Sequence, residues 1–212
     1  MYKLLLLFPF LLLFSCQEAS NTEQEDAVKN HVTFSGKIIN STVDSIGILS
    51  REFSKIIAIG DDGSFKDTFS LEPGTYYLTT QEKGMIVFLK NGYDLSLSVD
   101  NKAFETSAKF TGEGSKENNY LIEKANFEEG LLFQDLSHLT EVQLDSAVEV
   151  IISQAADFIH KQEGIDSLLI NENLADLNRM SKPLKDHYVT AFRLLEKMPK
   201  GGAAPLFTDY EN

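Results

Sequence analysis

The spacing of apolar residues changes once along the chain, and this change constrains the fold more than any other feature. Between residues 31 and 111 apolar residues alternate with polar ones and are interrupted by turn signals, whereas after Gly112 they recur every three or four positions. Alternation is typical of half-buried strands, and three-to-four spacing is typical of helices that bury one side. The sequence therefore predicts an α+β fold, with an antiparallel β-sandwich or barrel-like module at residues 31–112 and a helical segment at residues 113–199.

Short clusters of glycine, proline, asparagine and aspartate separate the predicted strands. Proline presets φ for a turn and glycine accepts positive φ, so these clusters indicate turns at residues 60–63, 72–74, 83–84 and 91–92. The Asn-Gly pair at 91–92 is the strongest hairpin signal in the chain. A last strand is predicted over residues 104–110. Short strands at such regular spacing favour a sandwich or a barrel.

Cap and stop signals divide the predicted helical segment. Serine or threonine can cap a helix start, glycine ends a helix, and proline is tolerated in the first turn. The signals are Ser115 before a helix that runs towards Gly130, a Thr140/Gln143 capping box, Gly164 as a stop, a third helical stretch over about residues 166–180, and Pro183 near a helix start. Apolar stripes follow at Leu144, Val148, Ile151, Ala155 and Phe158/Ile159, and at Leu184, Tyr188, Ala191/Phe192 and Leu195.

The N-terminus has the pattern of a bacterial lipoprotein signal peptide. Lys3 precedes an apolar run of eleven residues, Leu4 to Phe14, and then Ser15-Cys16. Such a run is too short to span a bilayer, which needs about 20 residues. We therefore expect residues 1–15 to be removed and Cys16 to carry the lipid, although Phe14 departs from the small residue usual in a lipobox. The alternative is a plain signal peptide whose cleavage leaves an ordinary cysteine.

Charge narrows the range of partners. Residues 16–30 are polar, acidic and without aromatic residues, so a flexible tether is expected there. The formal net charge is −13, and removal of Lys3 with the signal peptide makes it −14. A nucleic-acid partner requires a basic face, so none is predicted, and electrostatic docking on anionic lipid is disfavoured. We interpret the acidity as solubility.

The chain lacks a recognisable catalytic set. Cys16 is the only cysteine, and lipidation would leave no thiol for catalysis, a disulfide or a metal. The histidines His31, His138, His160 and His187 show no metal-binding spacing, and the adjacent pair Glu128 and Glu129 should diverge on a helix. Asp61, Asp62 and Asp67 lack the order of a calcium loop. We predict no catalytic, cofactor or metal residues, and we take Tyr77 and Tyr93, from the aromatic group that also includes Tyr76 and Phe88, as candidates for an exposed contact surface.

Several stretches occur in the order found in one bacterial family. They are FSGKIIN, IAIGDDGSFKDTF, LEPGTYYLT, FLKNGYDLSLSVD and FTGEGSKENNYL, followed by KGGAAPLFTDYEN at residues 200–212. This layout resembles the lipoprotein module and helical linker that precede the redox domain of TlpA/ResA-type thioredoxin-like thiol–disulfide oxidoreductases. Gly201, Ala204, Pro205 and Phe207 look like the lead-in to that domain, with Leu206 where the family commonly has aspartate.

The resemblance implies a role without chemistry of its own. The family's C-x-x-C pair would come after residue 212, so we expect the chain to be a fragment whose full-length parent is a thiol–disulfide oxidoreductase. Disulfide reduction needs an attacking thiolate and a resolving thiol, which this chain lacks. The implied function is the non-catalytic lead module of a membrane-anchored periplasmic enzyme, with the redox domain and a protein disulfide substrate as partners.

Two other functions remain open. The first is a complete envelope lipoprotein that binds a protein or another ligand through its β module. The second is a surface lipoprotein of a nutrient-uptake system, for which the acidic residues after Cys16 would act as an export signal. Both share the anchor at Cys16 and differ in the partner and in the side of the membrane that the protein faces.

Overall fold

Two four-stranded sheets pack face to face and form a sandwich. The computed structural model describes residues 30–80, 83–132 and 139–196. The strands are β1 (Val32–Ile39), β2 (Ser45–Leu49), β3 (Ser54–Ala58), β4 (Ser64–Phe69), β5 (Gly74–Thr79), β6 (Gly84–Leu89), β7 (Asp94–Asp100) and β8 (Lys109–Gly112). Inward-facing residues such as Phe34, Ile48, Leu78, Val87 and Leu95 make a single core. The α+β class is confirmed, and of the two predicted arrangements the module is a sandwich.

The chain changes sheet four times within the sandwich. Sheet A has the order β4-β1-β7-β8, and sheet B has the order β3-β2-β5-β6. All strand pairs are antiparallel except β1 with β7, which run parallel. Since β7 arrives in sheet A after a crossover from β6, its direction is not tied to that of β1 by a hairpin.

The turn at Asn91-Gly92 is therefore a crossover, and the prediction of a hairpin there is wrong. A tight turn does form, because the Tyr93 N–H donates to the Lys90 carbonyl at 3.1 Å and Gly92 has φ +97°. A hairpin turn of the Asn-Gly type needs positive φ at both central residues, whereas Asn40 is the only non-glycine residue of the described chain with positive φ. The Gly92 N–H instead donates to His31 and places β7 beside the start of β1.

The segment predicted as a last strand is partly helical. A 3₁₀ turn, η1 (Asn101–Ala103), and a short helix, α2 (Phe104–Ser107), precede β8, which covers only Lys109–Gly112. The Asp100 carboxylate caps η1 by accepting from the Lys102 N–H at 2.9 Å. The Ser107 hydroxyl accepts from the Asp100 N–H at 2.8 Å, so local side-chain bonds outcompete the extended form here.

One side of the sandwich is closed by charged and aromatic contacts. The edge strands β3 and β4 belong to different sheets, and Lys55 on β3 forms an ion pair with Asp67 on β4 at 2.8 Å. The Lys55 ammonium also lies 5.8 Å from the ring centroid of Phe69. The Lys55 bond holds the pKa of the Asp67 carboxyl below its usual range. Asp67 is thus a structural residue.

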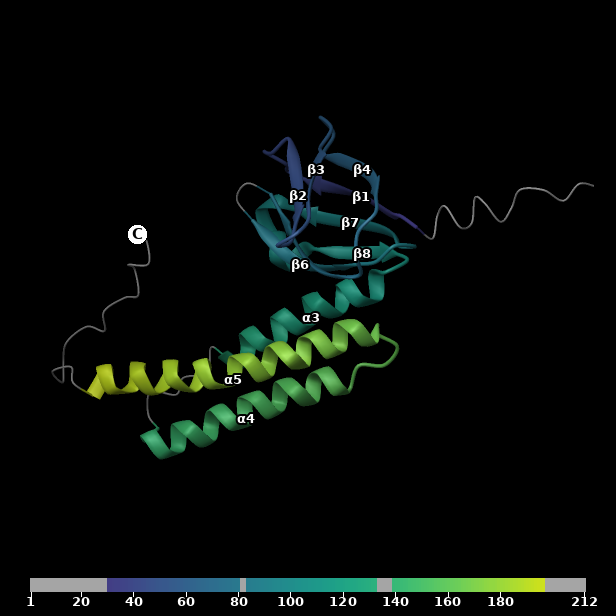
Figure 1. The fold of residues 1–212 in the computed structure, drawn as a ribbon. Coiled ribbons are helices and arrows are strands. Elements are labelled where there is room, and N and C mark those ends of the chain that lie inside the picture. The colour runs from purple at the N-terminus through teal and green to yellow at the C-terminus, as the bar shows by residue number, and fades with distance from the viewer. Residues whose placement is uncertain (1–29, 81–82, 133–138, 197–212) are drawn as a thin grey trace, which may run out of the picture.

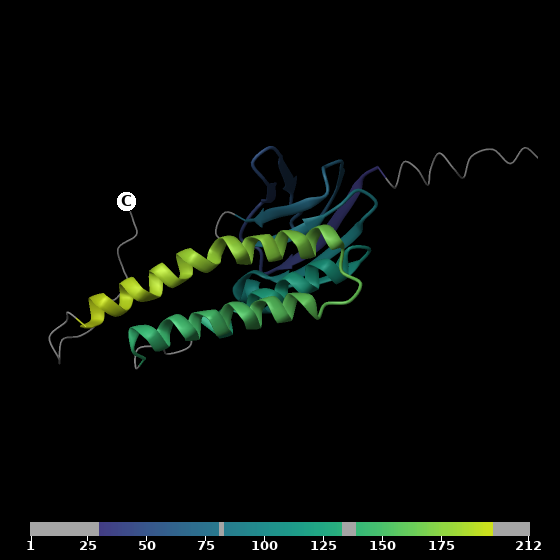
Figure 2. The same cartoon turned by 60° about the horizontal axis from the view of Figure 1, so that its bottom comes forward.

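Three long helices lie on one side of the sandwich (Figures 1 and 2). They are α3 (Ser115–Leu132), α4 (Glu141–His160) and α5 (Ser167–Glu196). The predicted Thr140/Gln143 capping box is present, and Gly164, at φ +66°, follows the end of α4. The predicted stripe of α4 is buried at Leu144, Val148, Ile151, Ala155 and Ile159 and half-buried at Phe158.

Pro183 lies inside a helix, which corrects the prediction of a helix start. The two predicted stretches, 166–180 and the one beginning near Pro183, are one continuous helix of 30 residues. Proline removes one backbone donor, but the helix carries apolar residues Leu177 and Leu184 on both sides of it, and these pack in the same small cluster with α4. Tertiary packing therefore overrides the local signal.

Asp166 joins α5 to the sandwich. Its carboxylate accepts from the Leu168 N–H at 2.9 Å, as a helix cap does, and pairs with Lys90 beyond β6 at 2.9 Å. The Lys90 bond, followed by that of Leu168, holds the pKa of Asp166 below its usual range in spite of burial. A depressed folded-state pKa stabilises the fold above the unfolded pKa, and this contribution is lost as pH falls through the folded one.

We expect Asp166→Asn to make stability less sensitive to acid. The amide can still cap α5 but carries no charge, so the variant should be weaker than the wild type at pH 6 and approach it as pH falls from 5 towards 2. Urea midpoints across this range measure the effect. Asp61→Asn, in the exposed turn after β3, is the control. Parallel pH curves for Asp166→Asn and the wild type would refute the assignment.

Candidate functional site

Two consecutive asparagines at the start of α3 attach the helices to both sheets. Asn118 accepts from the Phe88 N–H at 2.9 Å and donates to the Phe88 carbonyl at 2.8 Å. Asn119 makes the same pair of bonds with Phe110, both at 2.9 Å. Phe88 lies on β6, the edge of sheet B, and Phe110 lies on β8, the edge of sheet A. Each side-chain amide thus takes the place of a neighbouring strand, and we call the two residues the asparagine clamp.

Two glycines shape the entry to the asparagine clamp. Gly112 and Gly114 have φ of +89° and +91°. A Cβ on Gly114 would lie 2.2 Å from the Tyr93 ring, so only glycine lets the chain pass there. Tyr93 is 8% exposed, and burial raises the pKa of its hydroxyl. The prediction of Tyr93 as an exposed contact residue is therefore wrong.

Aromatic rings continue the attachment between the helices. Tyr120 stacks on Phe158 with centroids 6.2 Å apart, and Phe158 stacks on Phe127 at 4.5 Å. Burial, with a smaller effect from Glu128, raises the pKa of Tyr120 to about 12, although Asn173 of α5 donates to its oxygen at 3.3 Å. The Asn173 bond and the stacked rings make Tyr120 part of the packing between α3, α4 and α5.

The helices cover only one end of the outer face of sheet B. At that end Phe88 is fully buried, whereas Ile56 is 62% exposed, Tyr77 45% and Ile86 49%. Tyr77 and Ile86 are directly paired across β5 and β6. Because these side chains share one face with the half-buried Leu49, they form an apolar surface that we call the open face.

Glycines bring the side chains of the open face together. A Cβ on Gly84 would lie 2.4 Å from the Cζ and hydroxyl oxygen of Tyr77, so the end of this side chain lies over the glycine. A Cβ on Gly47 would lie within 3.4 Å of Ile56 and Thr79. Of the aromatic strand residues singled out in the sequence, Tyr76, Phe88 and Tyr93 are in the core and Tyr77 is exposed. Sequence reasoning missed Ile56 and Ile86, although both interrupt the alternation of apolar and polar residues.

A groove leads from the open face along the β6 edge to the helices. It has a volume of about 430 Å³ and is lined by β5, β6, α2, α3 and α5. Its apolar lining includes Met85, Ile86, Leu121, Ile122 and Ala125. The charged side chains in its lining are Glu105, Lys124, Glu128, Glu129 and Asp176. We call it the β6 groove. A polypeptide or another elongated apolar group fits this chemistry better than a small polar metabolite.

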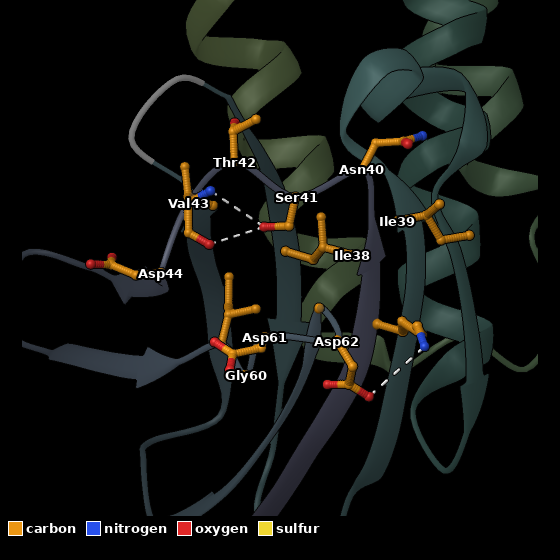
Figure 3. A pocket seen from close by; sticks show the side chains of 13 residues that line it. Ile38, Ile39, Asn40, Ser41, Thr42, Val43, Asp44, Gly60, Asp61 and Asp62 are labelled. Atoms are coloured by element: carbon orange, nitrogen blue, oxygen red, sulfur yellow. Dashed lines mark hydrogen bonds and ion pairs between the residues drawn. The ribbon is translucent and has the colours of Figure 1, made fainter.

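A second hollow lies between the β1–β2 loop and the turn after β3 (Figure 3). It has a volume of about 550 Å³. Asp62 at its rim accepts from the Ser64 hydroxyl at 2.6 Å and lies 3.9 Å from Lys37, while Asp61 is exposed. Asn40, at φ +56°, donates to Asp100 at 2.9 Å and fixes the loop. The hollow is shallow and polar, and no nucleophile and base converge in the part of it that is described.

Acidic and imidazole groups do not gather into a reactive centre in the described chain. The carboxylate of Asp67 is bound to Lys55, away from the turn that carries Asp61 and Asp62. Glu128 pairs with Lys124 at 2.8 Å, whereas Glu129 is exposed, so the two glutamates diverge as predicted. No group of three or more metal-ligand side chains occurs within residues 30–80, 83–132 and 139–196. His31 and His160 are exposed.

Several predicted features lie outside the described residues. These are the signal peptide at 1–15, the lipid-attachment residue Cys16 and its tether up to residue 29, His138, and the segment 200–212 that looks like a domain entrance. Within the described chain, no helix is both long enough and apolar enough to cross a bilayer.

Comparison with known proteins does not assign this chain to a family. No protein-family model matches the chain, and no curated protein matches it. One similar solved structure is a DUF3823 family protein from Bacteroides ovatus, with 16% sequence identity and a TM-score of 0.25. The match covers 32% of this chain and 42% of that protein, so the chain spans less than half of the neighbour's length.

Proposed function

We propose that this chain is the non-catalytic lead module of a lipid-anchored periplasmic thiol–disulfide oxidoreductase, in which it positions a thioredoxin-like domain. The observation that supports this proposal most is the attachment of the helices. The asparagine clamp fixes α3 to both sheets, and α5 continues for 30 residues, about 45 Å, with its C-terminal half extending away from the sandwich (Figure 1). A domain placed after α5 would be held at a defined distance and orientation.

The order of motifs in the sequence adds support. The G-x-G-S-x-x-N-x-Y-L stretch that resembles the TlpA/ResA-type module contains Gly112, Gly114 and Asn118, which act in the attachment, and Tyr120, which packs beside it. These residues attach the helices to the sandwich and pack beside that attachment, as a positioning module requires. The redox step itself would need two thiols of the attached domain, and a protein disulfide would be its substrate.

The proposed anchor is Cys16. A tether over residues 16–30 could hold the sandwich at most about 50 Å from the membrane, so the attached domain would act close to the envelope surface. Labelled palmitate should enter the wild-type protein and not a Cys16→Ala variant, which should appear in the soluble fraction. Equal labelling of both proteins would rule out Cys16 as the attachment site.

The proposed function is tested first by the coding DNA beyond codon 212. We expect an open frame with a C-x-x-C pair, and the protein encoded by the whole frame should reduce insulin disulfides. Replacement of both of these cysteines by serine should abolish this activity and leave the sandwich folded. A stop codon directly after residue 212, or an inactive full-length protein, would contradict the redox assignment.

A second candidate is an envelope lipoprotein that binds a protein ligand through its β module. The specific observation in its favour is the open face, where Ile56, Tyr77 and Ile86 remain exposed together. This candidate predicts that the protein without a redox domain is folded, monodisperse and able to bind its ligand.

A further inference from the structure

The backbone of β6 has two sides, and only one of them pairs with β5. Phe88 bonds to Asn118 with both its N–H and its carbonyl, so these groups point away from β5. At the other end of the strand, the Thr80 N–H donates to the Lys83 carbonyl at 2.7 Å and closes the β5–β6 hairpin. Pairs alternate along an antiparallel ladder. Counting from either end, Gly84, Ile86 and Phe88 all direct their backbone groups to the outer edge.

Asn118 occupies only one of these three edge positions. Its amide makes the two bonds that a neighbouring strand would make with Phe88. Within the described chain, β6 has β5 as its one strand partner, and no hydrogen bond from another segment reaches the outer edge at Gly84 or Ile86. Both residues line the β6 groove. The edge is therefore already shaped for a strand but is incomplete beyond Phe88.

The side chains around this edge define what could fill it. A residue opposite Ile86 would lie on the side of Ile86 away from Tyr77 and would extend the open face by one strand, so an apolar side chain fits there. Of the charged groove residues, Lys124 is paired with Glu128, and Asp176 with Arg179. Glu105 and Glu129 are left without an ion pair among the described residues and are exposed. The groove therefore favours positive charge at the ends of the segment.

We propose that the β6 groove binds an extended segment of a partner protein, which adds as a strand to β6 at Gly84 and Ile86. The segment has apolar residues at alternate positions and lysine or arginine at its flanks. Main-chain hydrogen bonds hold it, and the apolar positions and flanking charges select it. The site does not depend on an attached redox domain.

The chain's own tether is a poor occupant. Residues 17–30 carry four acidic residues and one lysine, so their net charge is negative and is repelled by Glu105 and Glu129. A second copy would have to bring together two acidic grooves if it paired β6 with β6. Charge complementarity thus favours a basic partner over the tether and over a second copy of the chain. The experiment distinguishes all three occupants.

The experiment uses the chain from residue 17 to residue 212 and a labelled peptide of alternating threonine and valine, with two lysines at each end. Fluorescence anisotropy should show saturable binding. Ile86→Pro should weaken it about tenfold, because it removes the outward N–H without breaking a bond to β5. Ile86→Val, which retains the N–H, should change it about twofold or less.

Two further probes distinguish strand addition from non-specific hydrophobic association of the peptide. A peptide N-methylated at alternate amides should lose binding, and glutamate flanks should weaken it. The double variant Glu105→Lys, Glu129→Lys should reverse the preference between lysine and glutamate flanks. These probes test strand addition to β6 even if the Ile86→Pro variant does not fold.

Three results would overturn the proposal. They are binding that is unaffected by N-methylation, absence of binding to a protein shown to be folded by circular dichroism, and a concentration-dependent dimer that Ile86→Pro abolishes. The last result would assign the edge to a second copy of the chain. None of these measurements depends on redox activity, so the outcome is independent of the proposed function.

Discussion

Replacement of Asn118 by alanine is expected to lower the free energy of unfolding by about 3 kcal/mol. The variant leaves the Phe88 N–H and carbonyl without partners, and Phe88 is fully buried. Each buried group that loses its only partner costs about 1–3 kcal/mol. Urea denaturation measures the loss. Because Asn118 also holds α3, limited proteolysis should cut the helical segment of the variant under conditions in which the wild type resists.

Matched variants separate the asparagine clamp from general effects of substitution. Asn118→Asp keeps an acceptor for the Phe88 N–H but places a fully buried carboxylate against the carbonyls of Phe88 and Gly114, so it should cost at least as much as Asn118→Ala. Asn119→Ala should cost less than Asn118→Ala, since Asn119 is half-buried whereas Asn118 is fully buried, so water can more easily replace the lost amide. Asn171→Ala, at an exposed position on α5, should be close to neutral. If all four variants were equally stable, the two bonds to Phe88 would have no structural importance.

Local patterns predicted the strands better than their arrangement. The turns at residues 60–63 and 91–92 form as expected, yet both join strands of different sheets. Turn residues specify φ and ψ over a few positions, and a turn that leads back to the same sheet has nearly the same local chemistry as one that leads to the opposite sheet. The parallel pair of β1 and β7 joins residues about sixty positions apart, which no short pattern records.

In the helices, too, local features were predictable from sequence and features that depend on the rest of the fold were not. The Thr140/Gln143 capping box and the α4 stripe were predictable because they depend on neighbours three or four residues apart. Pro183 misled the prediction because its local cost is outweighed by packing of Leu177 and Leu184 against α4. Residues 104–110 misled it because Asp100 and Ser107 bond to nearby backbone groups, a competition that alternation does not reveal.

The candidate sites required the structure. Tyr77 and Tyr93 were both proposed from sequence as exposed residues, but only Tyr77 is exposed, because Tyr93 packs against Gly114. The β6 groove depends on which backbone groups of β6 face outward, and that follows from the register with β5. The roles of Asn118 and Asn119 could not be predicted from the motif that contains them, because their partners Phe88 and Phe110 lie on two different strands.

Gly114→Ala is expected to cost about 3 kcal/mol, for two independent reasons. The residue has φ +91°, a conformation that side chains disfavour, and such strain costs about 1–3 kcal/mol. The new Cβ would also meet Tyr93 at Cδ2, Cε2 and Cγ, at 2.2, 2.5 and 2.7 Å. Because Cγ is next to the backbone of a buried residue, the ring cannot swing away. Either Tyr93 or the start of α3 must move, and the thermal midpoint measures the cost.

The same substitution at Gly130 should have the opposite sign, which makes it the control. Gly130 lies in α3, is exposed, and a Cβ there would meet nothing within 4 Å. Alanine is the better helix former, so Gly130→Ala should stabilise the protein by about 0.5–1 kcal/mol. If both variants were destabilised alike, helix α3 would be intolerant of any change. If neither were, Tyr93 would not be fixed against Gly114, and the entry to the asparagine clamp would be looser than its geometry requires.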